Sequence, residues 1–156
     1  MQAEKLQFIS TGFVPLLQPL SADTIGKWGK MNAQQMVEHV SGFFKVSTKK
    51  IKFPVVTPVE HLPKYKEFLL SDKEFWENTK APAGVVPDEP MATKSASMAA
   101  ALGELQQEID HFIQYFEDHP GAKTAHPVFG ELDFDEWVLL HYKHVVHHTK
   151  QFGIKC

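Results

Sequence analysis

The sequence of 156 residues contains no arginine and only one cysteine. All 16 basic residues are lysines, so the planar guanidinium that binds phosphate, carboxylate or guanine through two hydrogen bonds is missing. The single thiol, Cys156, cannot form an intramolecular disulfide, and no neighbouring base is positioned to activate it as a nucleophile. We therefore expect a cytoplasmic protein whose fold and chemistry do not depend on cysteine.

Strong charge and long apolar runs are also missing. The net charge of −3 leaves no basic surface for nucleic acid or for an anionic membrane, and we expect neither as a partner. No apolar run reaches the roughly 20 residues of a transmembrane helix, and Pro15 and Pro19 interrupt the apolar N-terminal run, which argues against a signal peptide. The 43% of apolar residues suffices for a core, and no repeat or shift in composition divides the chain, which predicts one domain over residues 1–156.

Apolar residues recur with the period of an α-helix and predict an all-α four-helix bundle. Capping boxes at Asn32 with Gln35 and at Asp133 with Glu136 mark the starts of the first and last helices. Ser71 with Glu74 indicates a restart within a doubtful second helix. The predicted helices cover residues of about 32–50, 64–79, 95–118 and 134–152.

The remaining segments are expected to lie outside this bundle. Residues before 32 form an extra N-terminal segment that wraps around it, with a short helix near residues 20–28. Proline-rich connections join the helices, and residues 81–91 hold three prolines. No segment shows the alternation of a β-strand.

Histidine is frequent, with nine residues in the chain and four on the last predicted helix. At 100° per residue, His141, His144 and His148 lie on the apolar face of that helix, close to Trp137. His39 lies on the apolar face of the helix over 32–50, together with Phe43. Imidazoles at the centre of two apolar faces suggest a buried polar site.

The positions of these histidines along their helices allow three of them to meet. His39 lies roughly 10 Å from the start of its helix, and His148 and His144 lie roughly 7 and 13 Å from the end of theirs. Antiparallel packing would therefore bring all three to one height, where the i, i+4 pair and His39 could hold a metal ion. Pairs that use His141 or His147 are alternatives, as is an inward histidine that only forms hydrogen bonds in the core.

Two stretches of the sequence resemble a domain-of-unknown-function branch of the DinB-like superfamily, which includes YfiT-like proteins. The first is WGKMNAQQMVEH at 28–39. The second begins with HPVFG at 126–130, continues through DEW at 135–137 and ends with HVVHHTKQFG at 144–153. The resemblance implies a four-helix bundle with one divalent metal ion, held by the residues at its motif positions, His39, His144 and His148.

The favoured function is that of a metal-dependent enzyme with Zn²⁺, Ni²⁺ or Fe²⁺ as its cofactor, acting on a small molecule or a thiol as hydrolase or thiol transferase. A metal-bound water or thiolate would be its nucleophile, and the sequence identifies no general base. The alternatives are a non-enzymatic stress protein that binds metal or a small ligand, and a bundle with structural histidines that acts through its surface as a homo-oligomer, for example a homodimer. Candidates for the pocket wall and for support of the ligands are His141, Gln151, Trp137 and Phe43.

Overall fold

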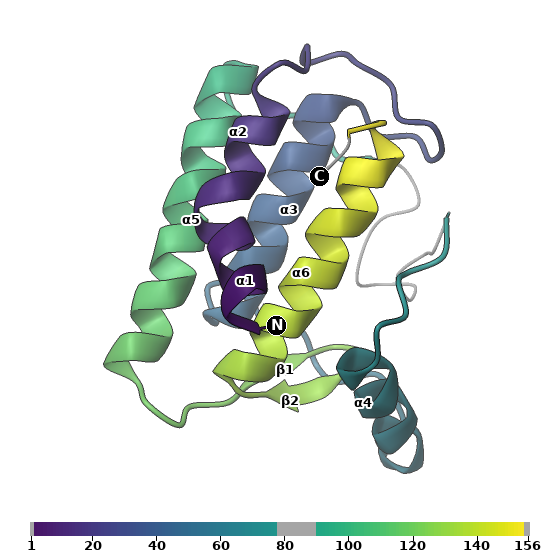
Figure 1. Ribbon diagram of the computed structural model, residues 1–156, viewed down its shortest axis with the longest axis vertical. Helices are drawn as coiled ribbons and strands as arrows, with labels where there is room; N and C mark the ends of the chain where they lie inside the picture. The colour runs from purple at the N-terminus through teal and green to yellow at the C-terminus, as the bar shows by residue number, and fades with distance from the viewer. Residues whose placement is uncertain (1, 78–89, 155–156) are drawn as a thin grey trace.

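The structure of the chain is a computed structural model that describes residues 2–77 and 90–154. It is mostly helical, with one antiparallel sheet of two short strands (Figure 1). Its elements in chain order are α1 (Gln2–Gln7), the π-helix η1 (Phe8–Gly12), α2 (Phe13–Leu17), α3 (Ala33–Ser47), the 3₁₀-helix η2 (Val59–His61), α4 (Leu62–Leu70), α5 (Met98–Asp118), β1 (Thr124–His126), β2 (Gly130–Leu132) and α6 (Phe134–Gln151).

Three long helices, α3, α5 and α6, correspond to the helices predicted over 32–50, 95–118 and 134–152. Both predicted capping boxes are present, because the Asn32 and Asp133 side chains accept hydrogen bonds from the backbone N–H three residues later and the Gln35 and Glu136 side chains reciprocate. Helix α5 begins after Ser97, whose hydroxyl caps it.

The N-terminal segment is part of the core, which corrects the prediction that it wraps outside. Helices α1 and α2, joined by η1, run beside α5 and α6 (Figure 1). Ile9, Phe13 and Leu17 are fully buried against the long helices. Pro15 does not break the segment, because it lies in the first turn of α2, where a missing N–H costs no hydrogen bond of that helix. No helix forms at residues 20–28.

The helix predicted over 64–79 is confirmed over 64–70 and is wrong over 71–77. Helix α4 ends at Leu70, residues 71–77 are not helical, and residues 78 and 79 lie outside the described part of the chain. Ser71 is extended and its hydroxyl donates to the Phe68 carbonyl, while the Lys143 ammonium donates to the carbonyls of Ser71 and Lys73. These contacts end the helix, and α4 lies at one end of α6 (Figure 1), so it is not the second bundle helix that we predicted.

The β1–β2 hairpin corrects the all-α prediction. It connects α5 to α6, with Thr124 opposite Leu132 and His126 opposite Gly130. The backbone N–H of Val56 donates to the Pro127 carbonyl, which ties the hairpin to the segment before η2. Strands of three residues are too short for an alternating pattern to be recognised in the sequence.

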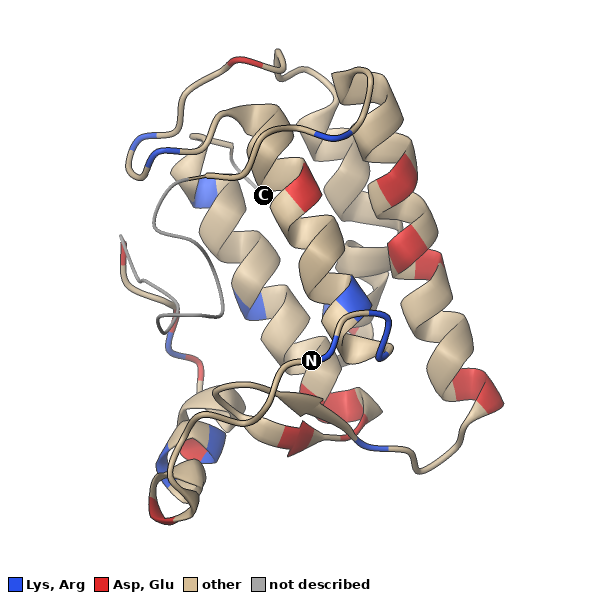
Figure 2. Ribbon diagram, turned by 180° about the vertical axis from the view of Figure 1, so that it is seen from behind, with Lys and Arg blue, Asp and Glu red and all other residues tan. Residues whose placement is uncertain are grey.

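Charged side chains are spread over the surface. Figure 2 shows acidic residues at several levels of α5, and two of them pair with lysines from the α3 side, Lys45 with Glu104 and Lys50 with Glu108, each at 2.9 Å. Within residues 2–77 and 90–154, no helix combines the length and the apolar character needed to cross a bilayer. Most of the connection over 81–91 and Cys156 lie outside the described residues.

Candidate metal centre

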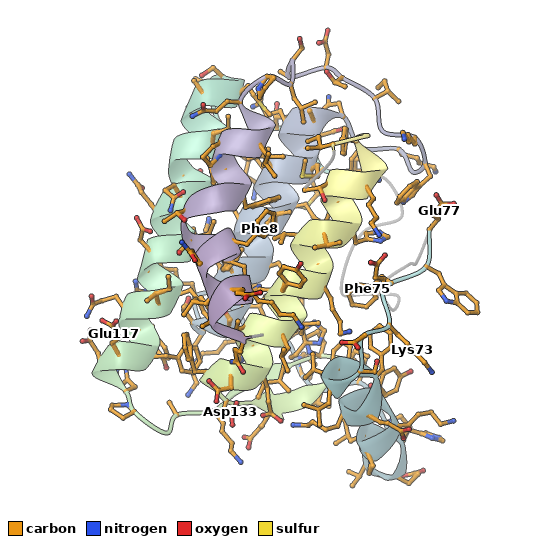
Figure 3. All side chains as sticks on the ribbon, viewed as in Figure 1. Phe8, Lys73, Phe75, Glu77, Glu117 and Asp133 are labelled. Carbon is orange, nitrogen blue, oxygen red and sulfur yellow. The ribbon has the colours of Figure 1, made fainter. Side chains whose placement is uncertain are left out.

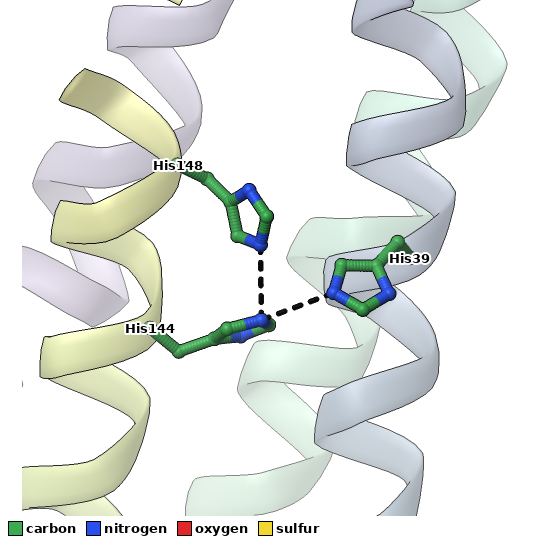
Figure 4. Close-up of side chains that lie close together, drawn as sticks. All are labelled: His39, His144 and His148. Carbon is green, nitrogen blue, oxygen red and sulfur yellow. Dashed lines mark hydrogen bonds between the residues drawn. The ribbon is translucent and has the colours of Figure 1, made fainter. Parts of the chain in front are cut away.

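Three imidazoles from two helices converge in the interior. Helix α3 supplies His39 and helix α6 supplies His144 and His148, whose Nε2 atoms point toward one another (Figure 4). The His144 Nε2 lies 3.1 Å from the His39 Nε2 and 3.0 Å from the His148 Nε2, and one nitrogen from each of the three rings lies within 4.8 Å of the other two. His144 and His148 are buried, and His39 is partly buried.

The hydrogen bonds of His148 fix which of its nitrogens carries the proton. Its Nδ1 lies 2.7 Å from the Gln151 Oε1, and the Gln151 Nε2 in turn donates to the Trp28 carbonyl at 2.9 Å. Because Oε1 can only accept, the His148 Nδ1 carries hydrogen and its Nε2 presents a lone pair. This is the arrangement of a metal-ligating histidine, whose second nitrogen donates to a neighbouring acceptor.

One hydrogen cannot form linear hydrogen bonds along both short contacts of His144. A neutral imidazole carries either a hydrogen or a lone pair at Nε2. If the His144 Nε2 carries hydrogen, it can donate to the His148 Nε2 but cannot accept from His39. If it carries a lone pair, it faces the lone pair of His148. A cation resolves this conflict, because it accepts all three lone pairs at once.

The spacing of the nitrogens is close to that of ligands on one ion. Zn–N distances of about 2.05 Å at tetrahedral angles place two nitrogens about 3.3 Å apart. The two observed contacts are 3.0 and 3.1 Å. Two of the three nitrogen pairs therefore have nearly the spacing of ligands on one ion, and the third pair lies within 4.8 Å.

Burial keeps these imidazoles neutral, which is the form that binds metal. Removal from water, together with the nearby His147, lowers the pKa of His39 to about 4. Burial also lowers the pKa of His144 and of His148 well below the usual value, with a contribution from the neighbouring imidazoles. All three side chains are therefore neutral near pH 7.

Phe43 forms one wall of the centre, as predicted for the pocket. Its ring stacks on the His144 ring at a centroid distance of 4.0 Å and an angle of 27°. The His144 Nδ1 is buried, and no group among residues 2–77 and 90–154 lies within hydrogen-bond range of it. The stacked ring therefore fixes the plane of His144 without binding its second nitrogen.

His141 and Trp137 belong to the core next to the centre. The His141 ring stacks on Phe44 at 3.8 Å and lies 5.2 Å from the Trp137 ring. The Ser47 hydroxyl donates its hydrogen to the Phe44 carbonyl, so it accepts from the His141 Nε2, which lies 3.1 Å away. The structure therefore places His141 outside the group of three nitrogens, and the alternative pair with His144 is not formed.

His147, the other alternative partner, points to a surface hollow of about 420 Å³. Its ring lies 5.1 Å from the His148 ring, 5.5 Å from the Trp28 ring and 6.0 Å from the Phe75 ring. Figure 3 shows Phe75 and Glu77 on the segment that faces α6. The lining combines aromatic rings with charges of both signs and consists of Lys27, Trp28, Glu74, Phe75, Glu77, His147, Lys150, Gly153 and Ile154.

His126 is a buried histidine that the sequence did not single out. Its Nδ1 accepts hydrogen bonds from the backbone N–H groups of Val128 and Phe129, which closes the hairpin turn. Its ring lies 5.3 Å from Phe43, and burial lowers its pKa to about 3. The adjacent Pro127 suggested only a turn, and no periodic pattern could reveal that the hairpin folds back onto α3.

The comparison with protein families gives one match. A family model described as "Protein of unknown function (DUF1569)" matches residues 15–155. This range contains the three convergent histidines, Gln151 and Phe43. No curated protein and no solved structure matches the chain.

Proposed function

The chain belongs to the DUF1569 family, and from this premise we propose that it is a metal-dependent enzyme with one divalent ion held by His39, His144 and His148. The observation that carries this proposal is that the His39 and His148 Nε2 atoms lie 3.1 and 3.0 Å from the His144 Nε2 in the interior. A linear hydrogen bond between neutral imidazoles can satisfy only one of these two contacts.

Zn²⁺, Ni²⁺ and Fe²⁺ all suit three imidazole ligands. Such an ion keeps a position for water or for a thiol and lowers the pKa of either, which is the chemistry of a hydrolase or of a thiol transferase. The chain itself supplies three neutral nitrogens and the apolar ring of Phe43, which stacks on His144. It also supplies the Gln151 Oε1, which accepts the hydrogen bond of the His148 Nδ1. His141 supports the core behind this wall through its stack on Phe44.

We also propose that the DinB-like resemblance is real and that the helices form the bundle it implies. The support is positional: His39 lies on the first long helix, and the His-x-x-x-His pair lies on the last one. Since α4 lies to one side, the fourth helical layer would be the N-terminal α1–η1–α2 segment, which packs against α5 and α6.

The substrate would be a small molecule or a low-molecular-weight thiol that enters beside His147. His147 lines the hollow there and its ring lies 5.1 Å from the His148 ring, and the mixed lining suits a ligand with an apolar part and a charged part. Lysine is the only cationic side chain that can hold a substrate carboxylate here, because the sequence contains no arginine.

Cobalt substitution tests whether the centre has an open position. The Co²⁺-loaded protein is titrated with 2-mercaptoethanol and, separately, with azide, and its absorption spectrum is recorded. We expect a thiolate-to-cobalt charge-transfer band in the wild type, none in His148→Ala, and the wild-type spectrum in His61→Ala, which removes an exposed histidine far from the centre in the sequence.

The same experiment separates the enzyme from the non-enzymatic alternative. A cobalt spectrum that neither thiol nor azide perturbs would show a closed site and favour a stress protein that binds metal or a small ligand. Failure of the wild type to bind Co²⁺ at all would refute the ligand set. Hydrolase and thiol-transfer substrates are then screened only with protein that has passed this test.

A further inference from the structure

The connection between α2 and α3 lies over the C-terminal end of α6 and holds Gln151. The Lys27 N–H donates to the Gln151 carbonyl at 2.6 Å, and the Trp28 carbonyl accepts from the Gln151 side chain at 2.9 Å. The Trp28 ring also packs on His147 at 5.5 Å. Both the backbone and the side chain of Gln151 are therefore bound to this connection.

Two backbone hydrogen bonds join this connection to the start of α3. The Ala33 N–H donates to the Thr24 carbonyl at 2.8 Å, and the Gln34 N–H donates to the Ala22 carbonyl at 3.0 Å. These bonds tie residues 22–24 to the first turn of α3, the helix that carries His39. The segment that holds Gln151 is thus anchored to the two helices that supply the three histidines.

Two glycines in this connection pack directly against the Gln151 side chain. A Cβ at Gly29 would lie 2.8 Å from the Gln151 Nε2, and a Cβ at Gly26 would lie 3.0 Å from the Gln151 Cγ. Gly29 also has a φ of +77°, which side chains with a Cβ rarely adopt. A larger residue at Gly29 would push the Gln151 amide away from its observed place, and one at Gly26 would crowd the Gln151 Cγ and the Trp28 carbonyl.

We propose that Gln151 and the glycine connection around it form a positioning device for the metal centre. The Trp28 carbonyl can only accept, so it fixes the Gln151 NH₂ group and turns Oε1 toward His148. Oε1 then fixes the hydrogen on the His148 Nδ1 and leaves the Nε2 lone pair aimed at the other two histidines. None of these residues touches the ion. The inference rests on the proposed metal site, and it explains why the motif over 28–39 joins tryptophan and glycine to a ligand.

Zinc affinity is the first test, measured by competition with a chromophoric chelator. We expect Gln151→Met, which keeps the length of the side chain but has no hydrogen-bonding amide, to bind Zn²⁺ about 10- to 100-fold more weakly, as is typical when such a support is removed. Gly29→Ala is expected to weaken binding in the same direction. Gly121→Ala is the matched control, because its φ is +78° but a Cβ there has no neighbour within 4 Å, so it adds the same backbone strain without moving Gln151.

The second test needs no metal. Nitrogen-15 NMR of the metal-free protein reports which nitrogen of His148 is protonated. We expect Nδ1–H alone in the wild type and in Gln151→Glu, which keeps an acceptor, and a mixture of both forms in Gln151→Met. Because an unfolded chain would also show both forms, urea unfolding of each variant first identifies those that are fully folded under the NMR conditions, and only these are compared.

The outcomes of the two tests are distinct. Wild-type Zn²⁺ affinity in both Gln151→Met and Gly29→Ala, or an unchanged His148 proton in Gln151→Met, would overturn the inference. Equal weakening in Gly29→Ala and Gly121→Ala would assign the effect to strain and also overturn it. If the wild type binds no metal, the proposed function fails, and the proton position still decides whether Gln151 orients His148.

Discussion

Replacement of His126 by asparagine is expected to change how stability depends on pH. The His126 Nδ1 accepts from the backbone N–H groups of Val128 and Phe129, and an asparagine Oδ1 can accept in its place. Asparagine does not titrate, so His126→Asn removes the protonation while it keeps an acceptor at the hairpin turn. The His126 side chain contacts Phe43 rather than the three histidines, so the variant leaves the metal centre intact.

The direction and size of this change in stability with pH follow from the pKa of His126 in the folded and in the unfolded protein. Burial lowers it from 6.5 to about 3 in the folded protein. Between these values the unfolded chain binds one more proton than the folded chain. The contribution of the neutral His126 to the free energy of unfolding is therefore fully present above pH 6.5 and is lost as the pH falls toward 3. Each pH unit in this window costs about 1.4 kcal/mol, so His126 accounts for a loss of about 2 kcal/mol between about pH 7.5 and 5.

Urea unfolding followed by circular dichroism, with EDTA present, measures this loss. Wild type and His126→Asn are unfolded at several pH values, and the free energies of unfolding are compared within each protein. We expect the variant to lose about 2 kcal/mol less than the wild type over the same range, even if it is less stable at every pH. Parallel curves would show that folding does not lower the pKa of His126 and would refute the reasoning.

Three further predictions concern the centre and the helix ends. Zn²⁺ at a concentration 100-fold above its dissociation constant should raise the free energy of unfolding by about 2.7 kcal/mol in the wild type and not in His148→Ala, as measured by urea unfolding with and without metal. Phe43→Ala removes the ring stacked on His144 and should cost about 2 kcal/mol, below the value for a fully buried ring because Phe43 is partly exposed; a loss under about 0.5 kcal/mol would contradict this. Lys143→Met removes the donor to the Ser71 and Lys73 carbonyls and should speed proteolysis within 71–77. An unchanged digestion pattern would show that these hydrogen bonds do not hold the segment in place.

Local chemistry in the sequence was sufficient to predict the long helices. Asn32 with Gln35 and Asp133 with Glu136 act over three residues, and both capping boxes form in the folded protein. Because helix starts and the rise per residue are then fixed, the heights of the three histidines along α3 and α6 could also be calculated. Their convergence in the structure also required that the two helices pack against each other, which local features do not determine.

The errors lie where distant contacts decide the structure. Ser71 resembles a helix start, but the ammonium of Lys143 on α6 binds the carbonyls of this segment and keeps it extended. Pro15 resembles a helix break, but the apolar face of Ile9, Phe13 and Leu17 has a place to pack only once the long helices are assembled. Likewise, the choice of His144 with His148 over a pair with His141 depends on Phe44 and Ser47, which lie on another helix.

The metal content of the purified, untagged protein tests the central claim most directly. Wild type, His144→Ala and His61→Ala are dialysed against Zn²⁺, Ni²⁺ or Fe²⁺ under identical conditions, and bound metal is measured by elemental analysis. We predict one bound ion per chain in the wild type and in His61→Ala, and none in a folded His144→Ala. Bound metal that survives in His144→Ala, or a wild type that binds none after reconstitution, would contradict it.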